Sequence, residues 1–287
     1  MNNVQDLIEL ITLKQLHPTQ FEGFSKTVGS PNVFGGQVLA QAVNAATRTI
    51  TNNRVLHSMH AYFLEAGDLE VPIIYDVSII RDGGSFSVRR VTALQNGLTI
   101  FIVSASFQKK EEGYNHQIKM DEAIKKPEEL LSWTEVLHQF GDFIPEKTKN
   151  FLSADRPVEF KPVELINPFD RKDLPAFTNV WFKLKGDASQ LDVAAKQQIL
   201  TYVSDYNILA AVMNRHASKA HWGNTVTASL DHSMWFFRDF DFDDWLLYAI
   251  ETPNASGARG FAQGNIFTRD GTLVASVAQE GLLRPKV

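Results

Sequence analysis

The residues best suited to chemistry lie in one short stretch, where Ser204 and Asp205 precede an apolar helical pattern. Hydrophobic side chains recur there on one helical face, at Ile208, Leu209, Val212 and Met213. Serine and aspartate are both favoured at a helix N-cap, where they accept hydrogen bonds from free backbone N–H groups. A carboxylate that faces a cavity instead can deprotonate a water molecule. The stretch therefore predicts a helix that begins near Asp205, with a carboxylate that acts as a cap or as a general base.

A serine-hydrolase triad is a second arrangement that the polar residues allow. Ser229, His232 and either Asp205 or Asp231 would supply its three residue types. Ser229 and His232 are three positions apart in a strand-like segment, so their side chains should point to opposite faces. This spacing disfavours the triad.

The motifs of the sequence give little support for a metal site or a nucleotide-binding site. His57 and His60 are also three positions apart on an expected strand, which makes them a poor metal-binding pair. The phosphate-binding, zinc-protease and G-x-S-x-G motifs do not occur in the sequence. We therefore expect no metal and no other cofactor.

The composition excludes further classes of function. The 287-residue chain carries a formal net charge of −5, which argues against nucleic-acid binding through bulk charge. It contains no cysteine, so disulfides, thiolate metal ligands and a cysteine nucleophile are ruled out. The first residues lack the basic and apolar regions of a signal peptide, and no apolar run is as long as a membrane span. We expect a soluble cytoplasmic protein that does not insert into a membrane.

The elements that must position the polar residues fall into two similar series. The first is a short helix, a strand, a central helix and four strands, over 5–16, 21–27, 34–46, 56–64, 72–81, 86–95 and 99–108. The second is a strand over 180–185, two helices beginning near Asp192 and Asp205, and strands over 225–231, 234–238, 245–252, 258–267 and 273–280. Between them lies a charged, proline-punctuated stretch with one helical patch over 133–140. Gly35 and Gly36 open the central helix of the first series, where they leave backbone N–H groups for an anion or a carbonyl oxygen, or allow close packing on a sheet.

The two series also match in their letters. His57–Ser58–Met59 corresponds to His232–Ser233–Met234, and other pairs match at a similar offset of roughly 170–175 residues. Asp205 aligns with Gly35, so only the second copy carries the carboxylate and only that copy is expected to be active.

This repeat predicts an α+β fold in which two copies of one βαββββ unit form a tandem (double) hotdog. In that arrangement each antiparallel sheet wraps a helix, and the two sheets join into one continuous sheet. The expected division is an N-terminal hotdog over 1–110, a connecting segment over 111–162 and a C-terminal hotdog with the catalytic residues over 163–287.

The sequence resembles the acyl-CoA thioesterase II family of double-hotdog enzymes over nearly its whole length. In the first half the resemblance lies in residues 32–37 (NVFGGQ), 57–64 (HSMHAYFL) and 81–89 (RDGGSFSVR). In the second half it lies in residues 204–205 (SD), 230–235 (LDHSMW), 258–260 (ARG) and 279–281 (QEG). Glu65–Ala66 departs from the pattern, because relatives often have Arg-Pro there.

The resemblance implies hydrolysis of fatty acyl-CoA thioesters to free fatty acid and CoA. It implies that Asp205, Ser229 and Gln279 activate and hold the attacking water. The substrate-binding residues that it suggests are Gly35, Gly36, His60, Phe34 and Met234, and an apolar tunnel would be lined by Phe34, Leu209, Met213 and Met234. It further implies a homodimer or homotetramer.

Two other functions compete with this interpretation. A hotdog enoyl-CoA hydratase begins its signature as Asp205-Tyr206-Asn207 does, but Ala210 stands where that enzyme needs a histidine. A non-catalytic acyl-CoA-binding module would have no use for all three polar residues. Turnover against simple binding distinguishes this module from the thioesterase.

Overall fold

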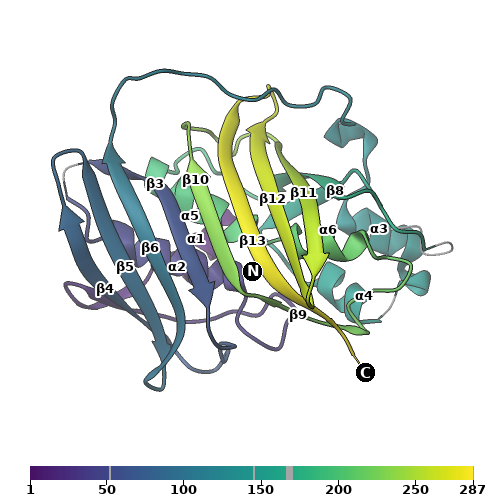
Figure 1. Ribbon diagram of the computed structural model, residues 1–287, viewed down its shortest axis with the longest axis horizontal. Helices are drawn as coiled ribbons and strands as arrows, with labels where there is room; N and C mark the ends of the chain where they lie inside the picture. The colour runs from purple at the N-terminus through teal and green to yellow at the C-terminus, as the bar shows by residue number, and fades with distance from the viewer. Residues whose placement is uncertain (52, 145, 166–170, 287) are drawn as a thin grey trace.

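Figure 1 shows the computed structural model of the chain, which describes residues 1–51, 53–144, 146–165 and 171–286. The α-helices are α1 (Val4–Ile11), α2 (Gly35–Thr47), α3 (Trp133–Phe140), α4 (Glu146–Ser153), α5 (Val193–Ser204) and α6 (Ile208–Asn214). The strands of the first half are β1 (Lys14–His17), β2 (Gln20–Gly23), β3 (Arg54–Phe63), β4 (Ile73–Asp82), β5 (Phe86–Gln95) and β6 (Leu98–Lys109). The later strands are β7 (Val158–Pro162), β8 (Phe177–Leu184), β9 (Thr225–Ser229), β10 (Asp231–Phe236), β11 (Leu246–Ser256), β12 (Arg259–Thr268) and β13 (Leu273–Pro285).

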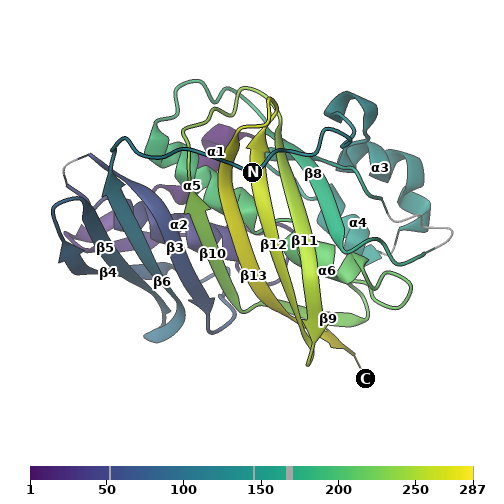
Figure 2. The ribbon, with the colours of Figure 1, turned by 45° about the horizontal axis from the view of Figure 1, so that its top comes forward.

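One antiparallel sheet joins all of these strands. Its order is β1-β2-β4-β5-β6-β3-β10-β13-β12-β11-β8-β7, and β9 pairs separately with β13. Figures 1 and 2 show α1, α2, α5 and α6 on one face of this sheet. Their buried side chains and the inward residues of the strands form one large core between the two layers. The expected α+β arrangement, with helices wrapped by one continuous sheet, is therefore confirmed.

The two halves meet where β3 pairs with β10. Met59 lies directly opposite Met234 in this pairing, and His60 lies opposite Ser233. Met59 and Met234 are also the matching residues of the sequence repeat, so the junction is symmetric about an axis between them. Two copies of one unit thus join through equivalent strands and leave no free sheet edge at the centre of the molecule.

The turn between β5 and β6 shows how local chemistry fixes strand pairing. Asn96 and Gly97 both have positive φ, at 50° and 78°. Two consecutive positive φ values are the requirement of a type I′ hairpin, which explains the Asn-Gly dipeptide there. The hairpin predicted from these letters is confirmed.

The helix expected to begin near Asp205 begins three residues later. Asp205 is the C-cap of α5, and Asn207 (φ 68°) precedes the first residue of α6. The left-handed conformation of Asn207 breaks the helical path between the two helices. Because apolar residues continue on both sides of this break, periodicity alone could not locate it.

The N-cap of α6 is Asn207, and neither Asp205 nor Ser204 caps this helix. Ser204 is the last residue of α5. Its hydroxyl lies 2.8 Å from the carbonyl oxygen of Thr201, inside the last turn of α5. The N-cap of α5 is Asp192, as the expected helix start requires, and its carboxylate accepts a hydrogen bond of 2.7 Å from the Ala195 N–H.

The stretch between the halves contributes more structure than its composition predicts. The chain that leaves β6 crosses one end of the sheet to reach α3, as Figure 1 shows along its upper edge. On this path Gln117 bonds the backbone of Gly271 and Leu273. The stretch also holds α4 and β7, neither of which was expected, and β7 pairs with β8.

Helices α2 and α5 run antiparallel and approach closely at one end. A Cβ on Gly36 would lie 2.4 Å from the carbonyl oxygen of Tyr202, which is shorter than any normal contact. Further along, Asn44 donates a hydrogen bond of 3.1 Å to Gln198. The missing side chain at residue 36 therefore sets the distance between the two helices.

We expect Gly36→Ala to lower the free energy of unfolding by about 1–3 kcal/mol, because the methyl group must push α5 away. Urea unfolding would measure this loss. Gly84→Ala is the matched control, because a Cβ there meets nothing within 4 Å and the backbone φ lies outside the left-handed region. Equal losses in the two variants would contradict the role given to Gly36.

Candidate active site

Asp205 lies at the break between α5 and α6, and its carboxylate points at the start of α2. Asp205 Oδ2 accepts a hydrogen bond of 2.8 Å from the Gly36 N–H. The N-cap residue of α2, Phe34, makes no side-chain cap of its own. The carboxylate therefore occupies the positive end of α2, where the helix dipole stabilises a negative charge. A side chain at residue 35 would prevent this contact, since a Cβ on Gly35 would lie 2.6 Å from Asp205 Oδ2.

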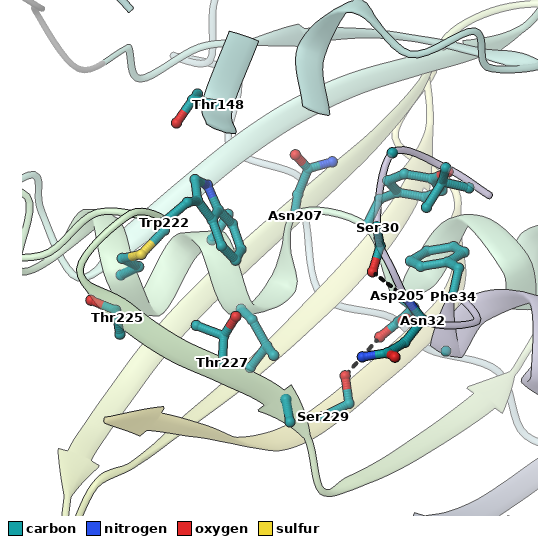
Figure 3. Close-up of a pocket in the computed structure, with 18 of the residues that line it drawn as sticks. Ser30, Asn32, Phe34, Thr148, Asp205, Asn207, Trp222, Thr225, Thr227 and Ser229 are labelled. Atoms are coloured by element: carbon teal, nitrogen blue, oxygen red, sulfur yellow. Dashed lines mark hydrogen bonds between the residues drawn. The ribbon is translucent and has the colours of Figure 1, made fainter. Parts of the chain in front are cut away.

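Ser229 and Gln279 complete a polar cluster around the same carboxylate. Gln279 Nε2 donates to Ser229 Oγ at 2.9 Å and to Asp205 Oδ1 at 3.1 Å. Ser229 Oγ donates to Asp205 Oδ1 at 3.4 Å. In Figure 3 the Asp205 and Ser229 side chains point toward each other, with Phe34 and Asn32 beside them. The three residues lie at positions 205, 229 and 279, far apart in the sequence, so only the folded structure brings them together.

The strand pairing explains why Ser229 and Gln279 meet. Ser229 ends β9 and lies opposite Gly281 of β13. Gln279 and Gly281 are two positions apart, so they occupy the same face of β13. The absence of a side chain at Gly281 leaves room for Leu209, whose Cδ2 would lie 2.3 Å from a Cβ there. The cluster is thus held by two paired strands and a helix break.

Asp205 and Ser229 form part of the wall of a cavity of about 910 Å³, while Gln279 is fully buried behind them and outside the lining of the described residues. One wall is apolar and comes from α3, α4 and the turn between them, with Trp133, Val136, Phe143, Ile144 and Leu152. Another wall is polar, where Thr225, Thr227 and Ser229 follow one face of β9 (Figure 3). Two cationic side chains, Arg171 and Lys286, also line the cavity. A cavity of this size and mixed lining suits an elongated ligand with an apolar and a polar part.

The residues predicted to bind substrate are divided between two places. Phe34 and Gly35 line the cavity, while the Gly36 N–H is occupied by Asp205 rather than left for a substrate oxygen. Met234 is fully buried on the strand pair β3/β10. His60 is exposed and bonds Ser233 there. Both lie outside the cavity lining in the described part of the chain, so the proposed site is built without them.

Two of the other expected tunnel residues, Leu209 and Met213, do line the cavity. They follow Asp205 at the spacing of one helical face, which is the signal that predicted them. The residues of α3 and α4 were missed, because their stretch was interpreted as a surface connection. Helix α3 itself was predicted over 133–140, and its capping box, in which Ser132 and Glu135 bond each other's backbone N–H groups, fits that start.

His232 lies behind the cluster and is fully buried. Its Nε2 lies 3.0 Å from Ser204 Oγ, and its Nδ1 bonds Gln279 Oε1. Both ring nitrogens are therefore engaged, and neither is left to activate Ser229. This arrangement argues against the serine-hydrolase triad. Inward and outward residues alternate along β10, so His232 lies on the buried face with Met234. This alternation can be recognised from the sequence.

The titratable groups around Asp205 are held in their neutral forms. Burial lowers the pKa of His232, against the opposing effect of the Asp205 charge. Burial also raises the pKa of Tyr206 to about 12 and that of Tyr248 well above its usual value. At neutral pH the carboxylate of Asp205 is thus the candidate base of the cluster.

Among the described residues, no group of three or more histidine or acidic side chains is placed to hold a metal ion. In that same part of the chain, none of the helices has both the length and the apolar character needed to cross a membrane.

The lowered pKa of His232 has a consequence for stability. Because the unfolded chain binds a proton at this residue more readily than the folded one, stability is present above about pH 6.5 and falls as the pH decreases below it. We expect His232→Asn to remove a slope of up to about 1.4 kcal/mol per pH unit below about pH 6.5. Urea unfolding of both proteins at several pH values measures the difference, and parallel curves would contradict it.

Comparisons with known proteins place this geometry in context. Residues 25–108 match the family model described as "Acyl-CoA thioesterase N-terminal domain", and residues 147–282 match that of "Acyl-CoA thioesterase". The chain is 41% identical over 281 residues to acyl-CoA thioesterase 2 of Haemophilus influenzae, which covers 98% of both chains. It is 38% identical over 267 residues to mouse acyl-coenzyme A thioesterase 8, covering 90% of this chain and 82% of the mouse protein.

A solved structure gives the same result. The crystal structure of an acyl-CoA thioesterase II from Mycobacterium marinum superposes with a TM-score of 0.79 at 34% identity, over 96% of this chain and 97% of that one. The family models and the relatives cover both halves of the molecule. The chain therefore belongs to the acyl-CoA thioesterase family of hotdog-fold hydrolases.

Proposed function

We propose that this chain hydrolyses fatty acyl-CoA thioesters to free fatty acid and CoA, with Asp205 as the general base and with Ser229 and Gln279 holding the attacking water. The observation that carries the proposal is a carboxylate and a hydroxyl that meet on the wall of a cavity of about 910 Å³, both bonded from behind by the buried amide of Gln279. Family membership supports the type of reaction, and the geometry supports these three residues.

The proposed reaction uses each group in one role. Asp205 takes a proton from water while the water oxygen attacks the thioester carbonyl, which forms a tetrahedral intermediate. The intermediate collapses, the C–S bond breaks, and the proton passes from Asp205 to the departing CoA sulfur. Because Gly36 binds Oδ2, the other carboxylate oxygen faces Ser229 and Gln279, where the water would be held.

The competing functions fit the cavity less well. Ala210 lines the cavity where a hotdog hydratase requires a histidine. His232, the buried histidine of the cluster, has both ring nitrogens bonded to Ser204 and Gln279. A binding module without catalysis would leave the buried Gln279 and its partners without a role.

We expect Asp205→Asn to lower kcat by about 10²-fold or more, because the substitution keeps the side-chain shape and removes the base. Release of CoA thiol from acyl-CoAs of graded chain length measures the rate, and the cysteine-free chain adds no thiol of its own. Asp192→Asn is the matched control, since it makes the same exchange at the N-cap of α5, at the opposite end of that helix.

Three outcomes distinguish the interpretations. Loss of activity in Asp205→Asn alone supports Asp205 as the base. Activity that survives this substitution would overturn the mechanism and keep the reaction. A folded wild-type chain that releases no CoA from any chain length would leave the acyl-CoA-binding module.

We further propose that the acyl chain packs against the apolar wall formed by α3 and α4. Val136 lines the cavity from α3, while Ile144 and Leu152 line it beside and within α4. The polar row of β9 and the cations Arg171 and Lys286 would then be left for the CoA arm and its phosphates. On this proposal the connecting segment over 111–162 supplies the acyl-chain selectivity of the C-terminal hotdog.

Val136→Trp tests this assignment by filling the cavity from a helix at the surface. We expect kcat/KM for hexadecanoyl-CoA to fall by about 10-fold or more relative to butanoyl-CoA, because only the long chain needs the filled space. Thr134→Trp, an exposed neighbour on α3 outside this cavity, is the control. An equal loss for both substrates would place the CoA arm, rather than the acyl chain, against α3.

Assembly and location extend the proposal. The exposed apolar side chains of Ile79, Ile80 and Phe86 lie on the neighbouring strands β4 and β5, and such patches mark association surfaces. They support assembly into a homodimer or homotetramer. The absence of cysteine fits action in the reducing cytoplasm.

A further inference from the structure

His232 is a buried histidine to which the proposed reaction gives no role. It lies on β10 with no exposed surface, and it bonds Ser204 on one side and Gln279 on the other. Ser204 directly precedes Asp205, and Gln279 bonds both Asp205 and Ser229. The imidazole thus connects two sides of the polar cluster from behind, without reaching the cavity lining of the described residues.

The hydrogen-bond partners fix the direction of the Gln279 amide. An ionised Asp205 is only an acceptor, so the group that faces its Oδ1 at 3.1 Å must be the NH₂ of Gln279. The carbonyl oxygen, Gln279 Oε1, then points away from the cavity toward His232 Nδ1. Because that oxygen is also only an acceptor, Nδ1 must carry the proton.

The other side of the ring is consistent with this tautomer. A neutral imidazole with its proton on Nδ1 has a bare Nε2, which needs a donor. The Ser204 hydroxyl lies 3.0 Å from Nε2 and can donate a hydrogen bond to it, or can donate instead to the Thr201 carbonyl oxygen at 2.8 Å. Asp205 and Asp231 are the charged groups that act on the ring, and the Asp231 carboxylate is held by the Glu280 N–H.

We propose that His232 is a positioning residue that holds the Gln279 amide in the one orientation useful for hydrolysis. The Nδ1–H donates to Gln279 Oε1, so both N–H groups of the amide are directed to the Asp205–Ser229 side. Without this donor the amide could rotate and present its carbonyl oxygen to the Asp205 carboxylate, where two acceptors repel each other and both Asp205 and Ser229 lose the donor that orients them toward the water. The inference rests on the proposed function, because it concerns how the same cluster holds its water.

The first test measures the tautomer directly and does not depend on turnover. The chain contains eight histidines, and selective ¹⁵N labelling of their rings gives a spectrum in which His232 is identified by its absence from His232→Asn. We expect a neutral ring with the proton on Nδ1 at pH 7. A neutral ring with its only proton on Nε2 would overturn the proposal whether or not the chain is a thioesterase, because Nδ1 could then not donate to Gln279 Oε1.

The second test is a double-mutant cycle with Gln279. We expect His232→Leu to lower kcat by about 10- to 100-fold, as is usual for residues that orient a catalytic group, with little change in KM. In a Gln279→Ala background the same substitution should cost no more than about twofold, because its effect passes through Gln279. Additive losses would show a general structural role and overturn the proposal.

Two further variants distinguish the loss of the His232 hydrogen-bond donor from the loss of its packing. His232→Asn keeps an N–H donor near the Nδ1 position, so we expect it to retain much more activity than His232→Leu. Tyr75→Phe removes a comparable buried hydrogen bond, 2.7 Å from Tyr75 Oη to the side-chain oxygen Oε1 of Gln41, far along the chain from the cluster. It should lower stability and leave kcat unchanged. If His232→Leu does not fold, the tautomer and His232→Asn still decide the question.

Discussion

The site depends on the contact between the Asp205 carboxylate and the first turn of α2. This contact requires two things at once, a break in the helical path after α5 and the absence of side chains at Gly35 and Gly36. A buried or half-buried carboxylate needs compensating donors, and the Gly36 N–H and the dipole of α2 supply them. The same amide that could have bound a substrate oxygen is thereby used to hold this carboxylate.

The continuous sheet determines the rest of the cluster. β13 lies between β10 and β12, and its C-terminal end pairs with β9 as well. β9 and β10 pair one after the other with the same edge of β13, so Gln279 has Ser229 and His232 as neighbours, each on a hydrogen-bonded strand. Groups placed on paired strands keep their geometry better than groups on loops, which suits a cluster that must orient one small molecule.

The two copies of the repeat form the continuous sheet, and the differences between the copies form the polar cluster. The strand junction is symmetric, with Met59 opposite Met234 at its centre. The helices are not, since Asp205 corresponds to Gly35 in the repeat and the two touch in the folded molecule. The single polar cluster thus uses the glycine of one half and the carboxylate of the other. The chain between the halves adds α3 and α4, which close one wall of the cavity.

The sequence alone determined most of the strands, the central helix α2, the repeat and the residue types of the cluster, because these follow from local periodicity and from letters that match between the halves. It could not locate the helix break at Asn207, because apolar residues continue on both sides of it. Nor could it assign β7 and α4, whose stability comes from partners distant in the chain. Tertiary structure alone decided that Gly36 binds Asp205, that Met234 lies away from the cavity, and that His232 stands behind Gln279. Each of these is a contact between segments far apart in sequence, where spacing along the chain carries no distance information.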